Sequence, residues 1–215
     1  MDPSTVEHLR QGLLSLILLI VSIGLHEFGH AWVADLRGDP LPRLQGRVSL
    51  NPFVHADPLG TIAIPAIMIF LSPGVGLIGW GKPVQVALMN PRTRRADDLL
   101  ITLAGPGMNL VLCLAFALAG GLGGYTQGPV ADFLEEGLVL NATLIAFNLI
   151  PVPPLDGSRV ALRLGLFSEA AFMAMARWGF IVLLVLVNLA PFRMFLGQVV
   201  KLIVLPCFGL WKALL

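Results

Sequence analysis

The sequence His26-Glu27-Phe28-Gly29-His30 places two imidazoles and one carboxylate within five positions of an apolar run at about 13–34. Residues four apart share one face of a helix, so both imidazoles can bind one metal ion at about 2.0–2.1 Å. Glu27 lies beside that face, where it can act as the general base towards a metal-activated water. Ionisable residues in a membrane helix are costly and face an interior or a cavity. The spacing therefore predicts a zinc hydrolase site, and polar packing between helices is the alternative.

A catalytic zinc site usually has a third protein ligand and one position open to water. We expect Asp156 to be that ligand, because it ends an apolar run broken by Pro151, Pro153 and Pro154. Such breaks free backbone groups and are tolerated in membranes only against protein or a water-filled cavity. The alternative is that Asp156 caps the helix that follows. The remaining candidates were His8, His55, Asp57, Asp97 and Asp98.

The composition requires a lipid environment for the helices that carry these residues. The chain is 56% hydrophobic and 13% charged, with a mean hydropathy of +0.84, whereas soluble domains are about 45–50% apolar and about 25% charged. The net charge is +1 and no basic block is interleaved with aromatic residues, so we expect no nucleic-acid partner. Cys113 and Cys207 lie in apolar runs and are predicted to be buried packing residues.

The chain is predicted to be an all-α polytopic membrane protein with about five full transmembrane helices. We expect one membrane-embedded domain over 1–215, with a catalytic core at about 13–160 and C-terminal helices at about 168–214. An apolar segment of roughly 20 residues can cross a bilayer as a helix. The apolar segments fall at about 13–34, 58–79, 99–122, 136–155, 178–192 and 195–214.

The segment 58–79 differs from the others because it contains three prolines and four glycines. These residues break or bend a helix, so we predict that it is re-entrant or interfacial. The next residues, near 79–88, are predicted to form a short membrane-associated β segment. Pro83 cannot donate to a ladder, so any strand there would be an edge strand.

The direction of the helices supports the same arrangement. His30 lies about 26 Å from the start of its helix near Leu13, and Asp156 lies about 27–30 Å along its own segment. The two ligands can meet only if an odd number of crossings separates them. One of the two intervening segments, 58–79 and 99–122, must therefore fail to cross, and the Pro/Gly-rich 58–79 is the obvious candidate. One side then has eleven Lys and Arg residues and the other side has two, Arg10 and Arg193; a crossing would change the split to nine and four. The positive-inside rule therefore predicts an outside N-terminus and a zinc site towards the cytoplasmic face.

Five motifs in this order resemble the site-2 protease family, and specifically its compact bacterial and archaeal branch without a PDZ or CBS domain. They are HEFGH, GRVSLNPFVHADPLGT, GWGKPVQV, LAGPGMN and FNLIPVPPLDGSR, and they span about residues 22–160. The resemblance implies an intramembrane zinc metalloprotease in a cell membrane. It implies one zinc ion per chain on His26, His30 and Asp156, with Glu27 as catalytic base.

The resemblance also implies that Asn109 and Asn148 lie near the site and hold substrate or water. An amide at Asn109 could instead join two helices within the membrane. His55 is typical of this branch, and we leave open whether it lines the site or only makes local hydrogen bonds. The edge near 79–88 could bind an unwound substrate by strand addition.

The predicted function is hydrolysis of peptide bonds in or near transmembrane segments of membrane-protein substrates. A transporter or channel that relays ions through buried His, Glu and Asp is one alternative. A zinc-binding membrane protein without catalysis is another. The predicted partners are a transmembrane protein substrate and the lipid bilayer, and the sequence leaves the oligomeric state open.

Overall fold

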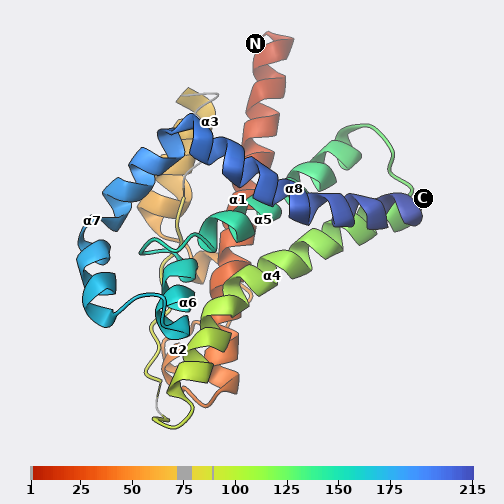
Figure 1. The fold of residues 1–215 in the computed structure, drawn as a ribbon. Coiled ribbons are helices and arrows are strands. Elements are labelled where there is room, and N and C mark those ends of the chain that lie inside the picture. Colours follow the sequence, from red (N-terminus) through yellow and green to blue (C-terminus); the bar gives the residue numbers. More distant parts are fainter. Residues whose placement is uncertain (1, 72–78, 89) are drawn as a thin grey trace. The chain divides into compact units, whose positions relative to one another are not determined.

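The computed structural model describes residues 2–71, 79–88 and 90–215. It divides into two compact units, Met1–Ala87 and Leu88–Leu215. The regular structure of the described residues is helical, and no strand occurs among them (Figure 1). The prediction of an all-α protein is therefore confirmed.

The first unit is built around one long helix, α1 (Pro3–Leu36). Short helical turns α2 (Leu41–Leu44), η1 (Pro52–Val54) and η2 (Pro58–Ala63) follow, and then the helix α3 (Ile64–Leu71). All four of these elements pack against α1. The Asp57 carboxylate starts η2 by accepting hydrogen bonds from the amides of Leu59 and Gly60, at 3.0 and 2.7 Å.

The described part of the predicted re-entrant segment is therefore helical, as η2 and α3, and residues 72–78 lie outside the described residues. The segment near 79–88, predicted to be a β element, is an irregular stretch of chain that runs elongated in Figure 1 and is called the extended segment below. It forms a single antiparallel bridge between Ala56 and Gly81 and no strand in the described part of the chain. Side-chain anchors hold most of it instead, and Pro83 has no amide hydrogen to contribute to a ladder.

The second unit contains α4 (Arg94–Leu122), α5 (Pro129–Asn148), α6 (Asp156–Leu164), α7 (Glu169–Asn188) and α8 (Ala190–Ala213). Helices α4, α5 and α8 pack on one another around Leu138 and Trp211 (Figure 1). The indole Nε1 of Trp211 donates to the carbonyl of Tyr125 at 3.0 Å. Cys113 and Cys207 are free, buried thiols in this core.

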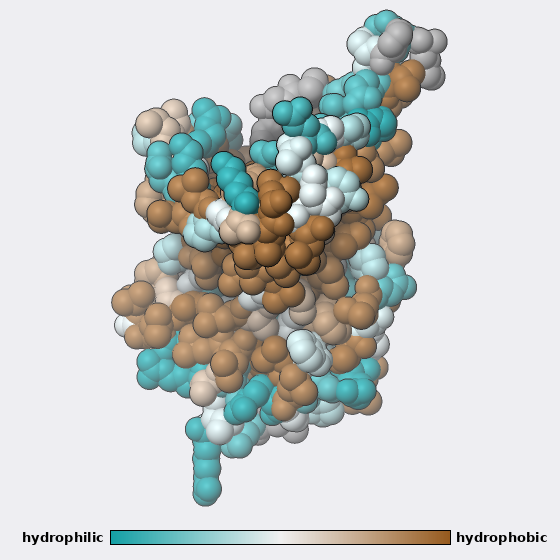
Figure 2. Space-filling view, turned by 90° about the vertical axis from the view of Figure 1, so that its right-hand side faces the viewer, coloured by the Kyte–Doolittle hydropathy of each residue, from teal (hydrophilic) through white to brown (hydrophobic). Residues whose placement is uncertain are grey.

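Within the described residues, four helices are long and apolar enough to cross a membrane, namely α1, α4, α7 and α8. Helix α5 is long enough but contains Asp132, Glu135 and Glu136. The sequence predicts about five membrane-spanning helices, and that number stays a prediction. Large hydrophobic side chains are exposed along these helices, Leu13 (52%), Phe180 (58%) and Leu202 (73%) among them, and Figure 2 shows broad hydrophobic surface. Exposed apolar area of this extent requires lipid, so the chain is an integral membrane protein.

Candidate metal and catalytic site

His26 and His30 lie one turn apart on α1, and both are buried. Their Nε2 atoms are 3.1 Å apart, and the rings meet edge to face with centroids 4.7 Å apart. Two nitrogens that bind one ion at about 2.0–2.1 Å with a tetrahedral angle lie about 3.3 Å apart. The pair therefore has the spacing that two imidazole ligands of one zinc ion require.

Glu27, which lies between the two histidines in sequence, faces a buried arginine from the loop after α2. Nη2 of Arg47 is 4.0 Å from Oε2 of Glu27, and the side chains are only 5% and 13% exposed, respectively. Burial lowers the pKa of the Arg47 guanidinium, and the Glu27 carboxylate opposes this effect. Arg47 also donates to the carbonyl of Lys82. This one cation thus connects the candidate base to the extended segment.

The extended segment 79–88 is attached to the first unit along most of its length. The amide of Lys82 donates to the carbonyl of His55 at 2.8 Å, and the amide of Ala87 donates to the buried Asp39 carboxylate. The side chain of Gln45 donates to that of Gln85 at 2.8 Å.

Gly81 brings this segment against the helix that carries the candidate base. A Cβ atom at Gly81 would lie 2.8 Å from Cγ of Glu27 and 2.9 Å from Cγ2 of Ile23. Only a glycine allows the backbone to pass so close to the Glu27 side chain.

His55 is fully buried behind the same segment. Its Nε2 lies 2.8 Å from the carbonyl oxygen of Ser49, which identifies Nε2 as the protonated nitrogen of the neutral ring. Its Nδ1 has no hydrogen-bond partner among the described residues. Burial lowers the pKa of His55, and the nearby positive charge of Arg47 acts in the same direction. The contacts support a local structural role, and a site-lining role stays a prediction.

Asn109 and Asn148 belong to the second unit. Asn109 on α4 is fully buried and donates through Nδ2 to Oδ1 of Asn141 on α5 at 2.8 Å. This bond joins two helices, which is the alternative that the sequence left open for Asn109. Asn148 donates through Nδ2 to the carbonyl of Leu144 at 3.0 Å, within the last turn of α5. A role of either amide towards substrate stays a prediction.

Asp156 is the first residue of α6, and Leu155 occupies the N-cap position. A carboxylate in the first turn of a helix is stabilised by the helix dipole. The preceding turn is tight, because a Cβ atom at Gly157 would lie 2.1 Å from the carbonyl oxygen of Leu149. The chain thus fixes the backbone of Asp156 at the start of a helix.

Sequence reasoning did not identify Arg47 and Gly81 as residues near the candidate base, or Asp39 as a residue that holds the segment 79–88. It counted Arg47 only as a charge in a loop. Arginine and aspartate are almost never fully buried unless they are paired, but a single sequence contains no signal that separates a buried arginine from its exposed neighbours Arg37 and Arg43.

Comparisons with known proteins identify the family of the chain. The model of Peptidase family M50 matches residues 14–128. "Putative zinc metalloprotease YwhC" of Bacillus subtilis (strain 168) is 38% identical over 179 residues, which are 79% of this chain and 78% of the relative. "Putative zinc metalloprotease Rip2" of Mycolicibacterium smegmatis is 31% identical over 172 residues, which are 78% of this chain and 63% of the relative. No solved structure matches the chain significantly. The chain belongs to Peptidase family M50, the site-2 protease family.

Proposed function

We propose that this protein is a zinc-dependent endopeptidase that hydrolyses peptide bonds in or near transmembrane segments of other membrane proteins. The observation that carries the proposal is the pair of Nε2 atoms 3.1 Å apart on His26 and His30, with Glu27 between them in sequence. The pair lies on α1, which is apolar and long enough to cross a membrane. Family membership and the names of the relatives agree with metal-dependent proteolysis.

His26, His30 and Asp156 are the proposed ligands of one zinc ion. Two imidazoles and one carboxylate are the protein ligands of several catalytic zinc sites, and they leave a position open for water. Zinc supplies the Lewis acidity that activates a water molecule and polarises a peptide carbonyl. In this assignment α6 contributes the carboxylate and α1 contributes both imidazoles.

Glu27 is the proposed general base. Its carboxylate takes the proton from the attacking water and later returns it to the leaving amine. Arg47 is the proposed positioning residue for this step, because its guanidinium lies 4.0 Å from the Glu27 carboxylate. A buried cation at this distance can fix the orientation of the Glu27 carboxylate.

The substrate must be unwound before it is cleaved, because a helix hides its carbonyl groups in internal hydrogen bonds. We propose that residues 82–87 bind the unwound backbone by strand addition. Exposed and half-buried positions alternate over Pro83, Val84, Gln85, Val86 and Ala87, as expected for an extended segment with one outward face. The close approach of Gly81 to Glu27 would bring such a substrate to the candidate base.

We further propose that the site faces the cytoplasm and that the N-terminus lies outside. The proposal rests on the charge distribution and on the need for His30 and Asp156 to lie at the same side of the membrane. It requires that the segment 58–79 does not cross the bilayer.

The test is to incubate purified wild-type protein and the Glu27→Gln variant with a panel of transmembrane peptides, with zinc measured in both proteins. We expect equal zinc contents and a loss of cleavage in Glu27→Gln of about 100-fold to 10,000-fold, the usual contribution of a general base. Cleavage by both proteins would remove Glu27 from its role. Zinc in both proteins without cleavage by either would favour a binding protein over a protease.

A further inference from the structure

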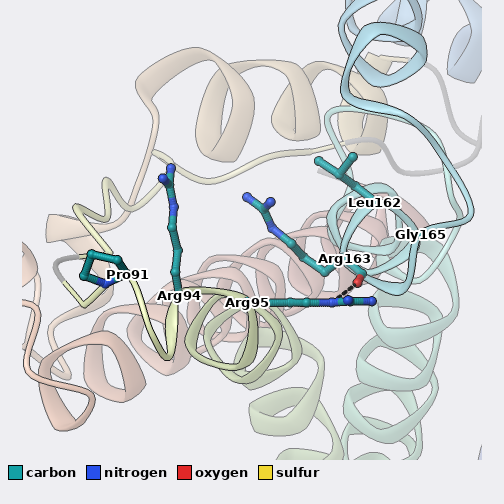
Figure 3. A pocket seen from close by; sticks show the side chains of 6 residues that line it. All are labelled: Pro91, Arg94, Arg95, Leu162, Arg163 and Gly165. Carbon is teal, nitrogen blue, oxygen red and sulfur yellow. Dashed lines mark hydrogen bonds between the residues drawn. The ribbon is translucent and has the colours of Figure 1, made fainter.

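A cluster of positive charge, apart from the candidate metal site, lies in the second unit where the beginning of α4 meets the end of α6. There a pocket of about 340 Å³ is lined by Pro91, Arg94, Arg95, Leu162, Arg163 and Gly165 (Figure 3). The volume is within the range of about 300–1,000 Å³ that is usual for small-molecule pockets. Three of the six lining residues are arginines, and none is acidic.

The acidic residues nearby do not balance these cations. Asp98 is fully buried and pairs with two arginines at once, Arg159 at 2.8 Å and Arg163. The Asp97 carboxylate is also buried and accepts a hydrogen bond from the Thr93 hydroxyl at 2.5 Å. Neither of these two carboxylates forms a described ion pair with Arg94 or Arg95 at the beginning of α4.

Arg94 and Arg95 begin α4, where the helix dipole is already positive. Nε of Arg95 donates to the carbonyl of Arg163 at 2.5 Å, which ties α4 to α6. Within the described residues, no hydrogen bond or ion pair involves the Arg94 guanidinium. Figure 3 shows the guanidinium groups of Arg94 and Arg163 extending to the same side of α4. Both side chains line the pocket, so an anion in it would meet positive charge from α4 and from α6.

We propose that this pocket binds a phosphate group and that the group belongs to the head group of an anionic phospholipid. Arginine binds phosphate oxygens through two parallel N–H bonds, which makes it the preferred residue for this group. Basic pockets at the ends of membrane-crossing helices bind acidic head groups in the same way.

The surroundings of the pocket favour a lipid over a soluble phosphate compound. Helix α4 is long and apolar enough to cross a membrane, and the pocket lies at its first turn. Leu100 and Leu103, in the next turns of α4, are 49% and 43% exposed. Leu164 and Leu166, which flank Gly165 of the pocket, are 57% and 70% exposed. An acyl chain can therefore lie on leucine side chains while its phosphate reaches the arginines.

The experiment is a titration of the purified full-length protein in a neutral detergent with short-chain phosphatidylglycerol, phosphatidylcholine or inorganic phosphate. Wild type is compared with Arg94→Gln, with Arg94→Gln/Arg95→Gln and with the matched control Arg177→Gln/Arg193→Gln. The control removes two exposed arginines from α7 and α8, outside the pocket. Binding is measured by native mass spectrometry.

We expect wild type and the control to prefer phosphatidylglycerol over phosphatidylcholine. We expect each Gln substitution in the pocket to weaken phosphatidylglycerol binding about fivefold, the usual effect of one basic residue near an anionic surface. Arg94→Gln alone suffices for the test if the double variant does not fold. Unchanged phosphatidylglycerol binding in the pocket variants would overturn the proposal. Equal binding of both lipids, or binding of inorganic phosphate as tight as that of phosphatidylglycerol, would overturn the assignment to an anionic lipid.

Discussion

At the scale of single residues, a buried arginine lies beside the candidate base Glu27. Arg47 contacts the Glu27 carboxylate and the Lys82 carbonyl, so it fixes the base and the extended segment together. Removing one member of such a buried pair leaves an uncompensated charge on the other. The substitution of Arg47 should therefore affect catalysis without removing a proposed zinc ligand.

We predict that Arg47→Gln lowers kcat for a transmembrane peptide by about 100-fold, the usual cost of a misplacement of about 1 Å in a catalytic group. The zinc content should not change, and Arg47→Lys should restore part of kcat because it restores the positive charge. The matched control is Arg43→Gln, since Arg43 forms an exposed ion pair with Asp35 at 2.6 Å. A loss of the same size in Arg43→Gln, or no loss in Arg47→Gln, would contradict this role.

His55 provides a prediction about stability and pH. Burial lowers the pKa of His55 in the folded protein, and the unfolded value is about 6.5. The unfolded chain therefore binds a proton that the folded protein excludes, so the contribution of His55 is complete above about pH 6.5 and falls as the pH decreases below it. Thermal unfolding between pH 5 and 8 should show a steeper loss at low pH for wild type than for His55→Gln. If the unfolding temperatures of the two proteins changed with pH in parallel, this role of His55 would be contradicted.

At the scale of elements, hydropathy predicted where the apolar helices lie but not where they begin. Helix α5 begins at Pro129 and not near 136, and α7 begins at Glu169 and not near 178. Hydropathy measures the lipid-exposed part of a helix, whereas backbone hydrogen bonds continue into its polar turns. For α7 the beginning is marked by a cap, since the Ser168 hydroxyl accepts a hydrogen bond from the amide of Ala171 at 3.1 Å.

The β segment predicted near 79–88 is not confirmed, and the sequence did not reveal what holds these residues in place. Contacts to this segment come from Asp39, Gln45, Arg47 and His55, which lie between α1 and η2 and are distant in sequence. No local pattern specifies such pairings, because they depend on how residues 39–55 fold. The spacing of His26 and His30, in contrast, is local to one helix, so the closeness of the two imidazoles could be predicted from the sequence alone.

Gly81 allows a test of this element. We predict that Gly81→Ala reduces cleavage at least tenfold, because its Cβ atom would lie 2.8 Å from Cγ of Glu27 and displace either the base or the segment. The control is Gly197→Ala in α8, where a Cβ atom would meet no atom within 4 Å. Peptide cleavage is the measurement, with zinc content as the check that the imidazoles are intact. Equal activity of the two variants would show that the segment does not need to lie against Glu27.

At the scale of the whole molecule, the charge distribution is the main argument for the orientation in the membrane. With 58–79 re-entrant, eleven Lys and Arg residues would share one side and two would lie on the other, while Lys201 lies within the apolar segment 195–214. The positive-inside rule then predicts that the side with eleven is cytoplasmic. Sequence alone could not determine the number of spans, because α5 combines a sufficient length with three acidic residues near its beginning.

We predict that single cysteines at Arg43 and Arg94 react with a membrane-impermeant reagent only from the cytoplasmic side, and that one at Gln127 reacts only from outside. Cys113 and Cys207 are buried, so the native thiols should contribute little background. The measurement is labelling in intact cells compared with inverted vesicles. Labelling of positions 43 and 94 from opposite sides would show that 58–79 crosses the membrane.

The most direct measurement is the zinc affinity of purified wild-type, His30→Ala, Asp156→Ala and Glu27→Gln proteins, determined by competition with a chelator of known affinity. We expect about one zinc ion per chain in wild type and in Glu27→Gln. We expect affinity at least about 100-fold weaker in His30→Ala and in Asp156→Ala, since even the loss of an outer-shell partner costs 10–100-fold. An Asp156→Ala protein with the zinc affinity of wild type would contradict the proposal that the two imidazoles and this carboxylate bind the same ion.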